Sequence, residues 1–278
     1  MIMKQHFILK ADGERELFQA MKLDASLERA GAAPALRARI LAHVEDELTD
    51  NMTTEQIYRH AFDILRHEET VTAVAARYSI KRAVFSLGPS GFPFEQFLSE
   101  VLKAHGWKTR TGVALNGRCA PHEVDVLAEK EGKRIGIEAK FHNEPIGRTD
   151  IKDALYVRAR YDDLARAPEE SSRVDEGWLV TNTRFTRNAI RYAQCVNLTL
   201  LAWDYPRNRG LLHLIEEARV HPLTCLTTLS DGEKRRLLEN RIVLCKDIQN
   251  AHLLQEYGVK PARIDSVLSE ARNLCSTQ

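Results

Sequence analysis

Two acidic residues and a lysine lie in two neighbouring stretches that alternate between apolar and polar residues. Asp125 lies in residues 122–128, and Glu138 and Lys140 lie in residues 134–140. Because successive side chains of a strand point to opposite faces, Glu138 and Lys140 project from the same face. Antiparallel pairing across a turn at Gly132 can place Asp125 beside them. The spacing therefore predicts two carboxylates and an ammonium at one edge of a sheet.

These three side chains could together hydrolyse a phosphate ester. Mg²⁺ prefers oxygen ligands and keeps several waters, so Asp125 and Glu138 suit it as ligands. Such a metal can clamp a phosphate and lower the pKa of a bound water. Lys140 could orient that water or offset charge on the phosphorus. A Glu and a Lys two residues apart are also ordinary on any polar strand face, so the spacing alone leaves a structural role open.

The elements around these residues predict an α/β core. Apolar or alternating runs indicate strands at residues 122–128, 134–140, 177–181 and 198–203, and amphipathic stretches indicate helices at 94–105, 149–165 and 186–195. Strands that alternate with helices favour a mixed sheet with helices on its faces.

Two stretches divide the chain into three predicted segments: 1–88, 89–219 and 220–278. Residues 86–93 hold two Pro and two Gly, which cannot continue a helix, and a helix gives way to a new start at residues 218–222. The first segment should be a short strand and an Asp12-Gly13 turn followed by helices. The last segment should be helical throughout, with helices at 226–239, 246–257 and 261–274.

The composition excludes several classes of protein. The 278 residues contain 40 Lys+Arg against 39 Asp+Glu, a formal net charge of +1, and 44% are hydrophobic. This balance excludes a disordered chain and a uniformly basic DNA-coating protein. No run of about 18 apolar residues exists, and the N-terminus lacks a secretory pattern, so we expect no membrane association. The five cysteines are widely spaced, which favours reduced thiols and a cytoplasmic location.

Residues 92–205 resemble the Mrr-like restriction endonucleases of the PD-(D/E)xK superfamily. The resembling blocks are Phe94-Glu95-Gln96-Phe97-Leu98 with Gly106-Trp107, His122 to Val126, Ile137 to Phe141, Val180-Thr181-Asn182 with Phe185-Thr186 and Ala189, and Leu200 to Asp204. The resemblance implies cleavage of DNA with Mg²⁺ or Mn²⁺, with Asp125 and Glu138 as metal ligands and Lys140 as a catalytic residue. It also implies Glu95 as a third carboxylate, although a solvated glutamate in a first helical turn is an equal alternative. Val124 stands where the superfamily name has Pro.

Residues 6–86 resemble the ATP-cone, a nucleotide-binding regulatory domain. The opening block reads Ile8-Leu9-Lys10-Ala11-Asp12-Gly13, then Glu16-Leu17-Phe18 and Lys22-Leu23, with later blocks at 52–57 and 75–80. The resemblance implies an ATP or dATP site at Lys10, Gly13, Glu16, Lys22 and Thr54. Lysines can meet phosphates, glycine permits a tight turn, and the start of a helix offers donors to an anion. Ala11 replaces a basic residue usual in the family, so a vestigial domain used only for packing or oligomerisation is the alternative.

The C-terminal segment has a weaker signal. Residues 253–261 resemble a helix-hairpin-helix hairpin, which would contact a duplex backbone through main-chain N–H groups. A plain helical appendage, with Gly258 ending a helix, is the simpler interpretation.

The sequence therefore predicts a metal-dependent DNA endonuclease regulated by ATP or dATP. Its expected partners are DNA and a nucleotide, with no membrane, and cleavage of a duplex favours a homodimer or higher oligomer. One alternative is a nucleotide-sensing DNA-binding regulator whose nuclease fold no longer cuts. Another is an oligomeric ATP-cone sensor with no DNA partner.

Overall fold

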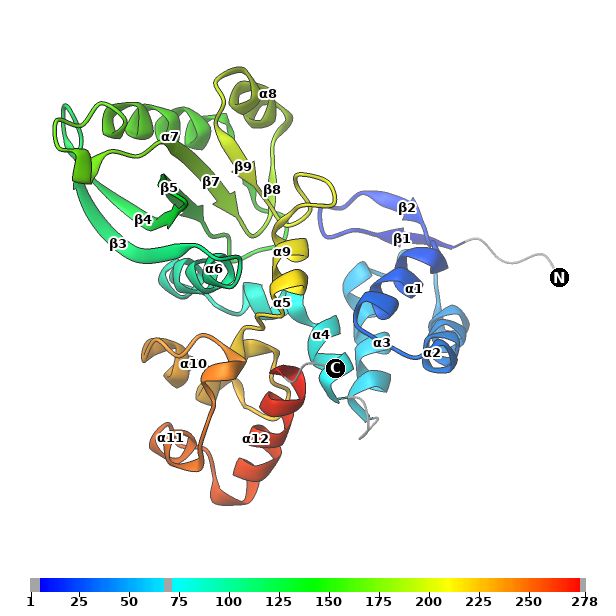
Figure 1. The fold of residues 1–278 in the computed structure, drawn as a ribbon. Coiled ribbons are helices and arrows are strands. Elements are labelled where there is room, and N and C mark those ends of the chain that lie inside the picture. Colours follow the sequence, from blue (N-terminus) through cyan, green and yellow to red (C-terminus); the bar gives the residue numbers. More distant parts are fainter. Residues whose placement is uncertain (1–5, 68–71, 276–278) are drawn as a thin grey trace. The chain divides into compact units, whose positions relative to one another are not determined.

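The structure is a computed structural model, and it describes residues 6–67 and 72–275. The chain forms two compact units (Figure 1). Unit 1 comprises residues 1–82, 225–231 and 248–278, and unit 2 comprises residues 83–224 and 232–247. The C-terminal segment at 220–278 therefore contributes to both units. Within the described residues, no helix is long and apolar enough to cross a membrane.

Unit 1 begins with the predicted hairpin, in which Phe7 pairs with Leu17 and Leu9 with Arg15 in an antiparallel register. Gly13 has a φ of 82°, a conformation that glycine adopts without strain, and it closes the turn of the hairpin. The elements are β1 Phe7–Leu9, β2 Arg15–Leu17, α1 Ala20–Arg29, α2 Pro34–Glu47, α3 Thr54–His67 and α4 Thr72–Tyr78, with α11 Ala251–Glu256 and α12 Pro261–Cys275 from the C-terminal segment.

The core of unit 1 lies between α1, α2 and α3. Ile40 and Val44, one turn apart on α2, are fully buried, as are Leu27 on α1 and Leu65 on α3. The face of α2 that carries Ile40 and Val44 thus packs into this core. A turn at Ser79 separates α4 from α5 (Ile80–Phe85).

Unit 2 contains a five-stranded sheet in the order β3-β4-β5-β7-β9. The first two pairings are antiparallel, and the pairings of β5 with β7 and of β7 with β9 are parallel. Its elements are α6 Phe92–Ala104, β3 Lys108–Asn116, β4 Pro121–Lys130, β5 Lys133–Lys140, β6 Arg148–Thr149, α7 Ile151–Leu164, a 3-10 turn at Glu170–Ser172, β7 Glu176–Thr181, β8 Arg184–Phe185, α8 Arg187–Cys195, β9 Thr199–Leu201, α9 Leu211–Ala218 and α10 Asp231–Glu239. Further 3-10 turns lie at Leu223–Cys225 and Cys245–Asp247.

Helices cover both faces of this sheet. The crossovers through α7 and α8 lie together on one face, and α6 lies on the other, against β3 and β4 (Figure 1). The mixed sheet flanked by helices confirms the predicted fold class. Strand β3 was not expected from the sequence, and the C-terminal helices α10 and α11 begin later than predicted. Residues 226–230 are not helical, and a 3-10 turn at Cys245–Asp247 followed by residues 248–250 precedes α11.

Two glycines let α7 approach the sheet closely. The ring of Tyr161 lies over Gly136 on β5 and Gly177 on β7, where an added Cβ atom would come within 2.2 Å and 2.3 Å of ring carbons. Any larger residue at either position would push the helix away. The close approach brings the α7 residue next to Tyr161, Arg160, to the sheet edge that carries Glu138.

Candidate functional site

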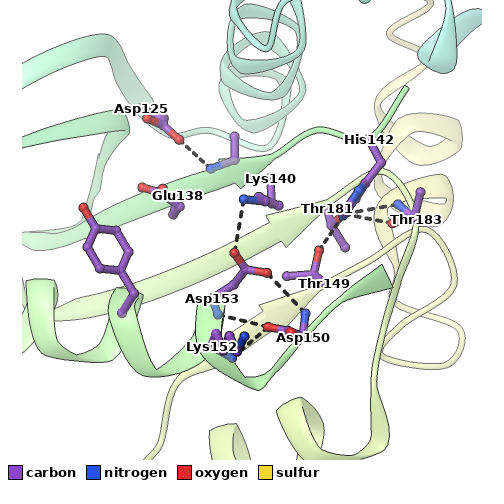
Figure 2. A network of polar contacts seen from close by, with 12 residues as sticks. Asp125, Glu138, Lys140, His142, Thr149, Asp150, Lys152, Asp153, Thr181 and Thr183 are labelled. Carbon is purple, nitrogen blue, oxygen red and sulfur yellow. Dashed lines mark hydrogen bonds and ion pairs between the residues drawn. The ribbon is translucent and has the colours of Figure 1, made fainter. Parts of the chain in front are cut away.

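Asp125 and Glu138 lie where β4 and β5 separate. The last pair in the register is Val126 with Ile137, so Asp125 and Glu138 occupy the next position along both strands. There the Asp125 carboxylate takes over the pairing, because its Oδ2 accepts a hydrogen bond from the backbone N–H of Ala139 at 2.7 Å (Figure 2). The two carboxylates therefore sit side by side, as the alternating pattern predicts.

Burial and mutual repulsion raise the pKa values of this group. Burial, followed by the charge of Asp125, raises the pKa of Glu138 to about 7. Burial also raises the pKa of Asp125, although the Ala139 N–H and Arg160 oppose the change. Glu95, in the first turn of α6, has its pKa raised to about 7 by burial and then by Asp125, Glu123 and Glu138. Burial and the repulsion between neighbouring carboxylates thus disfavour the charged forms of Glu95, Asp125 and Glu138.

The donor set suits a hard divalent cation. Carboxylates crowded at a strand edge are oxygen ligands whose repulsion a cation would relieve. Among residues 6–67 and 72–275, however, no three His, Cys, Asp or Glu side chains form a preassembled metal-binding group. The residues that fit a cation are therefore the pair Asp125 and Glu138, with Glu95 nearby.

Lys140 lies on the same strand as Glu138 but makes a different contact. Its Nζ pairs with Asp153 Oδ1 at 3.1 Å, in the first turn of α7 (Figure 2). Asp153 also closes the capping box of α7, because its Oδ2 accepts from the Asp150 N–H at 3.2 Å while Asp150 Oδ1 accepts from Lys152 and Asp153. The sheet edge and the start of α7 are thus connected through one ion pair.

The predicted nucleotide residues also come together in unit 1. The Glu16 carboxylate lies 2.9 Å from Lys10 Nζ and 3.2 Å from Lys22 Nζ. Burial would raise the pKa of Glu16, but the hydrogen bonds from the two lysines outweigh it and lower that pKa. Lys10 also pairs with Glu14 at 2.9 Å, and its pKa is raised to about 12 by Glu14 and Glu16. Lys10, Glu16 and Lys22 therefore form one compact ion-pair cluster.

The start of α3 lies beside this cluster. Thr53 forms a bridge with Leu9, the residue before Lys10, and the Leu9 N–H donates to Met52 O at 3.0 Å. Thr53 caps the helix, because its Oγ1 accepts from the Gln56 N–H and its own N–H donates to Gln56 Oε1. Thr54, the predicted contact, is the first residue of the helix. Gly13 lies in the hairpin turn, three residues from both Lys10 and Glu16.

Comparison with known proteins identifies each part of the chain. Residues 6–84 match the ATP cone domain, residues 88–207 match the family described as restriction endonuclease, and residues 221–275 match a family described as AF1548-like, C-terminal. An uncharacterized protein of Archaeoglobus fulgidus is 34% identical over 179 residues, which are 64% of this chain and 99% of that protein. The chain belongs to the AF1548-like family.

A solved member of the family supports the same assignment. The crystal structure of the protein of unknown function AF1548 is 32% identical, with a TM-score of 0.56, and the match covers 67% of this chain and 98% of that one. The family matches confirm two of the resemblances noted in the sequence, those to the restriction endonucleases and to the ATP-cone. This AF1548-like protein carries an ATP-cone domain and a restriction-endonuclease-like domain in one chain.

Arg160 is a member of the candidate site that the sequence did not reveal. Its guanidinium donates to the Glu138 carboxylate and to Glu123 O, and it lies beside Tyr156, whose hydroxyl is 2.6 Å from Nη2. Only 11% of the Arg160 side chain is exposed. No local motif marks this arginine, because its position depends on how closely α7 approaches the sheet.

A polar network of His142, Asn182 and Thr149 lies beyond the ends of β5 and β7, next to the candidate site. Asn182 extends the pairing of these strands, since it accepts from the His142 N–H and donates to His142 O, both at 2.8 Å. The His142 ring lies 3.0 Å from Thr149 Oγ1 (Figure 2). Burial, and then Lys140, lowers the pKa of His142. The His142 side chain is thus half-buried just after the end of β5.

Proposed function

We propose that this protein is a metal-dependent endonuclease that hydrolyses phosphodiester bonds of DNA. The observation that carries the proposal is the pair of crowded carboxylates, Asp125 and Glu138, in a restriction-endonuclease-like domain. Lys140 follows Glu138 by two residues on the same strand. Arg160 pairs with Glu138 but does not offset the burial of this carboxylate and its repulsion by Asp125. The raised pKa values of the two carboxylates point to a site that gains from binding a cation.

Asp125 and Glu138 would hold Mg²⁺ or Mn²⁺, with Glu95 available as a third carboxylate. The cation would supply positive charge to the phosphate and activate water for attack. Glu95, with a pKa of about 7, could accept a proton from water near neutral pH. Lys140 could stabilise charge on the phosphate when its ammonium leaves Asp153.

The same proposal assigns regulation to the ATP-cone. Lys10 and Lys22 are the phosphate-binding residues, and the capped start of α3 provides N–H donors beside them. Glu16 holds the two lysines together, and the Gly13 turn and Thr54 complete the site. ATP or dATP bound there is the expected effector of DNA cleavage.

Cleavage of supercoiled plasmid tests the catalytic assignment. Asp125→Ala and Lys140→Ala should each abolish nicking with Mg²⁺ or Mn²⁺, because each removes a ligand or a charge that the reaction needs. Glu169→Ala and Lys108→Ala, which alter exposed residues of the same unit, are the matched controls and should cut at the wild-type rate. Full activity of both Asp125→Ala and Lys140→Ala would refute the assignment.

A second candidate is a nucleotide-sensing DNA-binding regulator with an inactive nuclease fold. One observation favours it: Arg160 already pairs with Glu138, and Asp153 already pairs with Lys140. Protein that shifts DNA in a gel with EDTA present, but never nicks plasmid with Mg²⁺ or Mn²⁺, would establish this alternative.

A further inference from the structure

Two arginines lie directly opposite each other on the small sheet of unit 2. Strands β6 and β8 pair in parallel, with Arg148 opposite Arg184 and Thr149 opposite Phe185. Thr149 and Phe185 are buried, whereas both arginines are exposed, so the arginines share the outer face. The register therefore places two exposed cationic side chains next to each other on one face of the small sheet.

Further exposed basic side chains lie on the two helices that follow β6 and β8 in the chain. Residues 182–195 contain three arginines and neither Asp nor Glu. Two of these, Arg187 and Arg191, are exposed one turn apart on α8, and Lys152 is exposed in the first turn of α7. We name Arg148, Lys152, Arg184, Arg187 and Arg191 the arginine face.

Two acidic residues at the start of α7 make contacts within that helix start and with the candidate site. Asp150 caps α7 by accepting from the Lys152 N–H at 2.8 Å. Asp153 pairs with Lys140 at 3.1 Å.

Hydrogen bonds tie the arginine face to the candidate cleavage site. The Thr186 N–H, at the start of α8, donates to Thr149 O at 3.0 Å, and Thr149 Oγ1 lies 3.0 Å from the His142 ring. Lys152 and Thr149 lie beside Lys140 and Asp153 in the same close view (Figure 2). The arginine face is therefore close to Lys140, because Lys152 of the face and the Lys140 partner Asp153 are adjacent residues in the first turn of α7.

We propose that the arginine face binds the sugar-phosphate backbone of duplex DNA next to the cleavage site. The inference rests on the proposed function, because it assigns the surface that presents the substrate. Arginine suits this role because its planar fork pairs with phosphate through two hydrogen bonds. Arg148 and Arg184 also take part in other interactions of the fold. The proposal depends on their exposed positions, opposite each other on β6 and β8. A local basic face also accounts for DNA binding by a chain whose net charge is only +1.

The salt dependence of DNA binding tests this surface. Fluorescence anisotropy of a labelled duplex, with EDTA present to prevent cleavage, gives the slope of log K against log salt from about 50 to 200 mM. Arg184→Gln and Arg187→Gln should each reduce the magnitude of the slope by about 0.9, the value for one lost phosphate contact. Arg187→Lys should keep the slope because it keeps the charge.

Arg166→Gln is the matched control. Arg166 is exposed and follows the C-terminal end of α7, about 20 Å along the helix from Asp150. Its substitution should leave the slope unchanged. Circular dichroism of every variant checks that the fold is intact.

Several outcomes would overturn the inference: wild-type slopes in both Gln variants, an equal loss in Arg166→Gln, no binding of duplex DNA by the wild type, or tighter binding to duplex RNA. The Asp125→Ala variant separates this inference from the proposed function, because it should lose cleavage and keep the wild-type slope. A protein that never cuts, yet loses slope in the Gln variants, would refute the nuclease and retain the surface. A protein that cuts DNA but shows unchanged slopes in the Gln variants would refute the DNA-binding surface and retain the nuclease.

Discussion

The candidate nuclease edge and the ATP-cone hairpin use the same residue types with opposite electrostatic results. At the nuclease edge, Glu138 is buried beside Asp125, and its pKa is raised to about 7. At the hairpin, Glu16 lies between Lys10 and Lys22, and its pKa is lowered. One carboxylate therefore lacks sufficient positive charge around it, whereas the other has two lysines.

The difference indicates what each region gains by binding a ligand. A cation at the nuclease edge relieves repulsion among carboxylates, so binding removes an existing electrostatic cost. A nucleotide phosphate at the hairpin must compete with Glu16 for the same two lysines. Under the proposed function, a bound cation would relieve repulsion at the nuclease edge, whereas a bound nucleotide would have to replace Glu16 at the hairpin lysines.

The largest effect that distinguishes the two regions is on stability. Between pH 4.5 and 7, folded Glu138 keeps a proton that the unfolded chain has lost, so the free energy of unfolding falls as pH rises. Glu138→Gln has no carboxyl group to titrate at this position. We therefore expect the decrease in the free energy of unfolding between pH 4.5 and 7 to be smaller by about 2 kcal/mol in this variant. Urea unfolding with EDTA present measures it, and all three tryptophans of the chain, at 107, 178 and 203, lie in unit 2 and report on that unit.

Glu169→Gln is the control for this measurement, because Glu169 is exposed and its loss should leave the pH dependence unchanged. An identical pH dependence in Glu138→Gln and wild type would show that Glu138 ionises normally in the folded protein.

The next effect concerns Arg160, the positively charged side chain that contacts Glu138 at the nuclease edge. The Arg160 guanidinium contacts Glu138, so it occupies a position where it repels a metal ion. Arg160→Gln should therefore strengthen Mn²⁺ binding about tenfold at pH 8.5, well above the pKa of Glu138. The electron paramagnetic resonance signal of free Mn²⁺ measures this binding without any cleavage assay.

Arg158→Gln is a matched control on the same helix, because Arg158 pairs with Asp162 and Val196 O instead of Glu138. Weaker Mn²⁺ binding in Arg160→Gln than in this control would show that Arg160 organises the site rather than competing with the metal.

These predictions also show how far local sequence patterns reach. The adjacency of Asp125 and Glu138 follows from a period of two on each strand and from the turn at Gly132, both of which are local. The fold class likewise follows from alternating strands and helices. Strand β3 escaped prediction because its residues, Lys108 to Asn116, are mostly polar or small, and most of them are only partly buried or exposed.

The positions of Arg160 and Lys140 could not be predicted in this way. Arg160 reaches Glu138 because Tyr161 fits over Gly136 and Gly177, a close packing between residues far apart in the chain. Lys140 turns to Asp153 because that residue also caps α7. Both contacts arise from tertiary packing, whereas the start of α3, at the predicted contact Thr54, is set locally by the cap that Thr53 forms with Gln56.

The smallest predicted effect lies at the ATP-cone hairpin, and it tests the competition between Glu16 and phosphate. Glu16→Gln keeps an oxygen acceptor for Lys10 and Lys22 but removes the negative charge that repels phosphate. We expect ATP and dATP to bind about fivefold more tightly, because freed lysines form charge-assisted hydrogen bonds with phosphate. Lys22→Ala should weaken binding by a similar factor, and isothermal titration calorimetry measures both.

Glu14→Gln provides the matched control, because Glu14 contacts Lys10 but has no contact with Lys22 among its interactions with described residues. It should change nucleotide affinity less than Glu16→Gln does. Weaker binding in Glu16→Gln would instead mean that the carboxylate contacts the nucleotide itself or is needed to hold the lysines. In that case the hairpin would resemble the nuclease edge, since in both regions a carboxylate would contribute directly to the bound state.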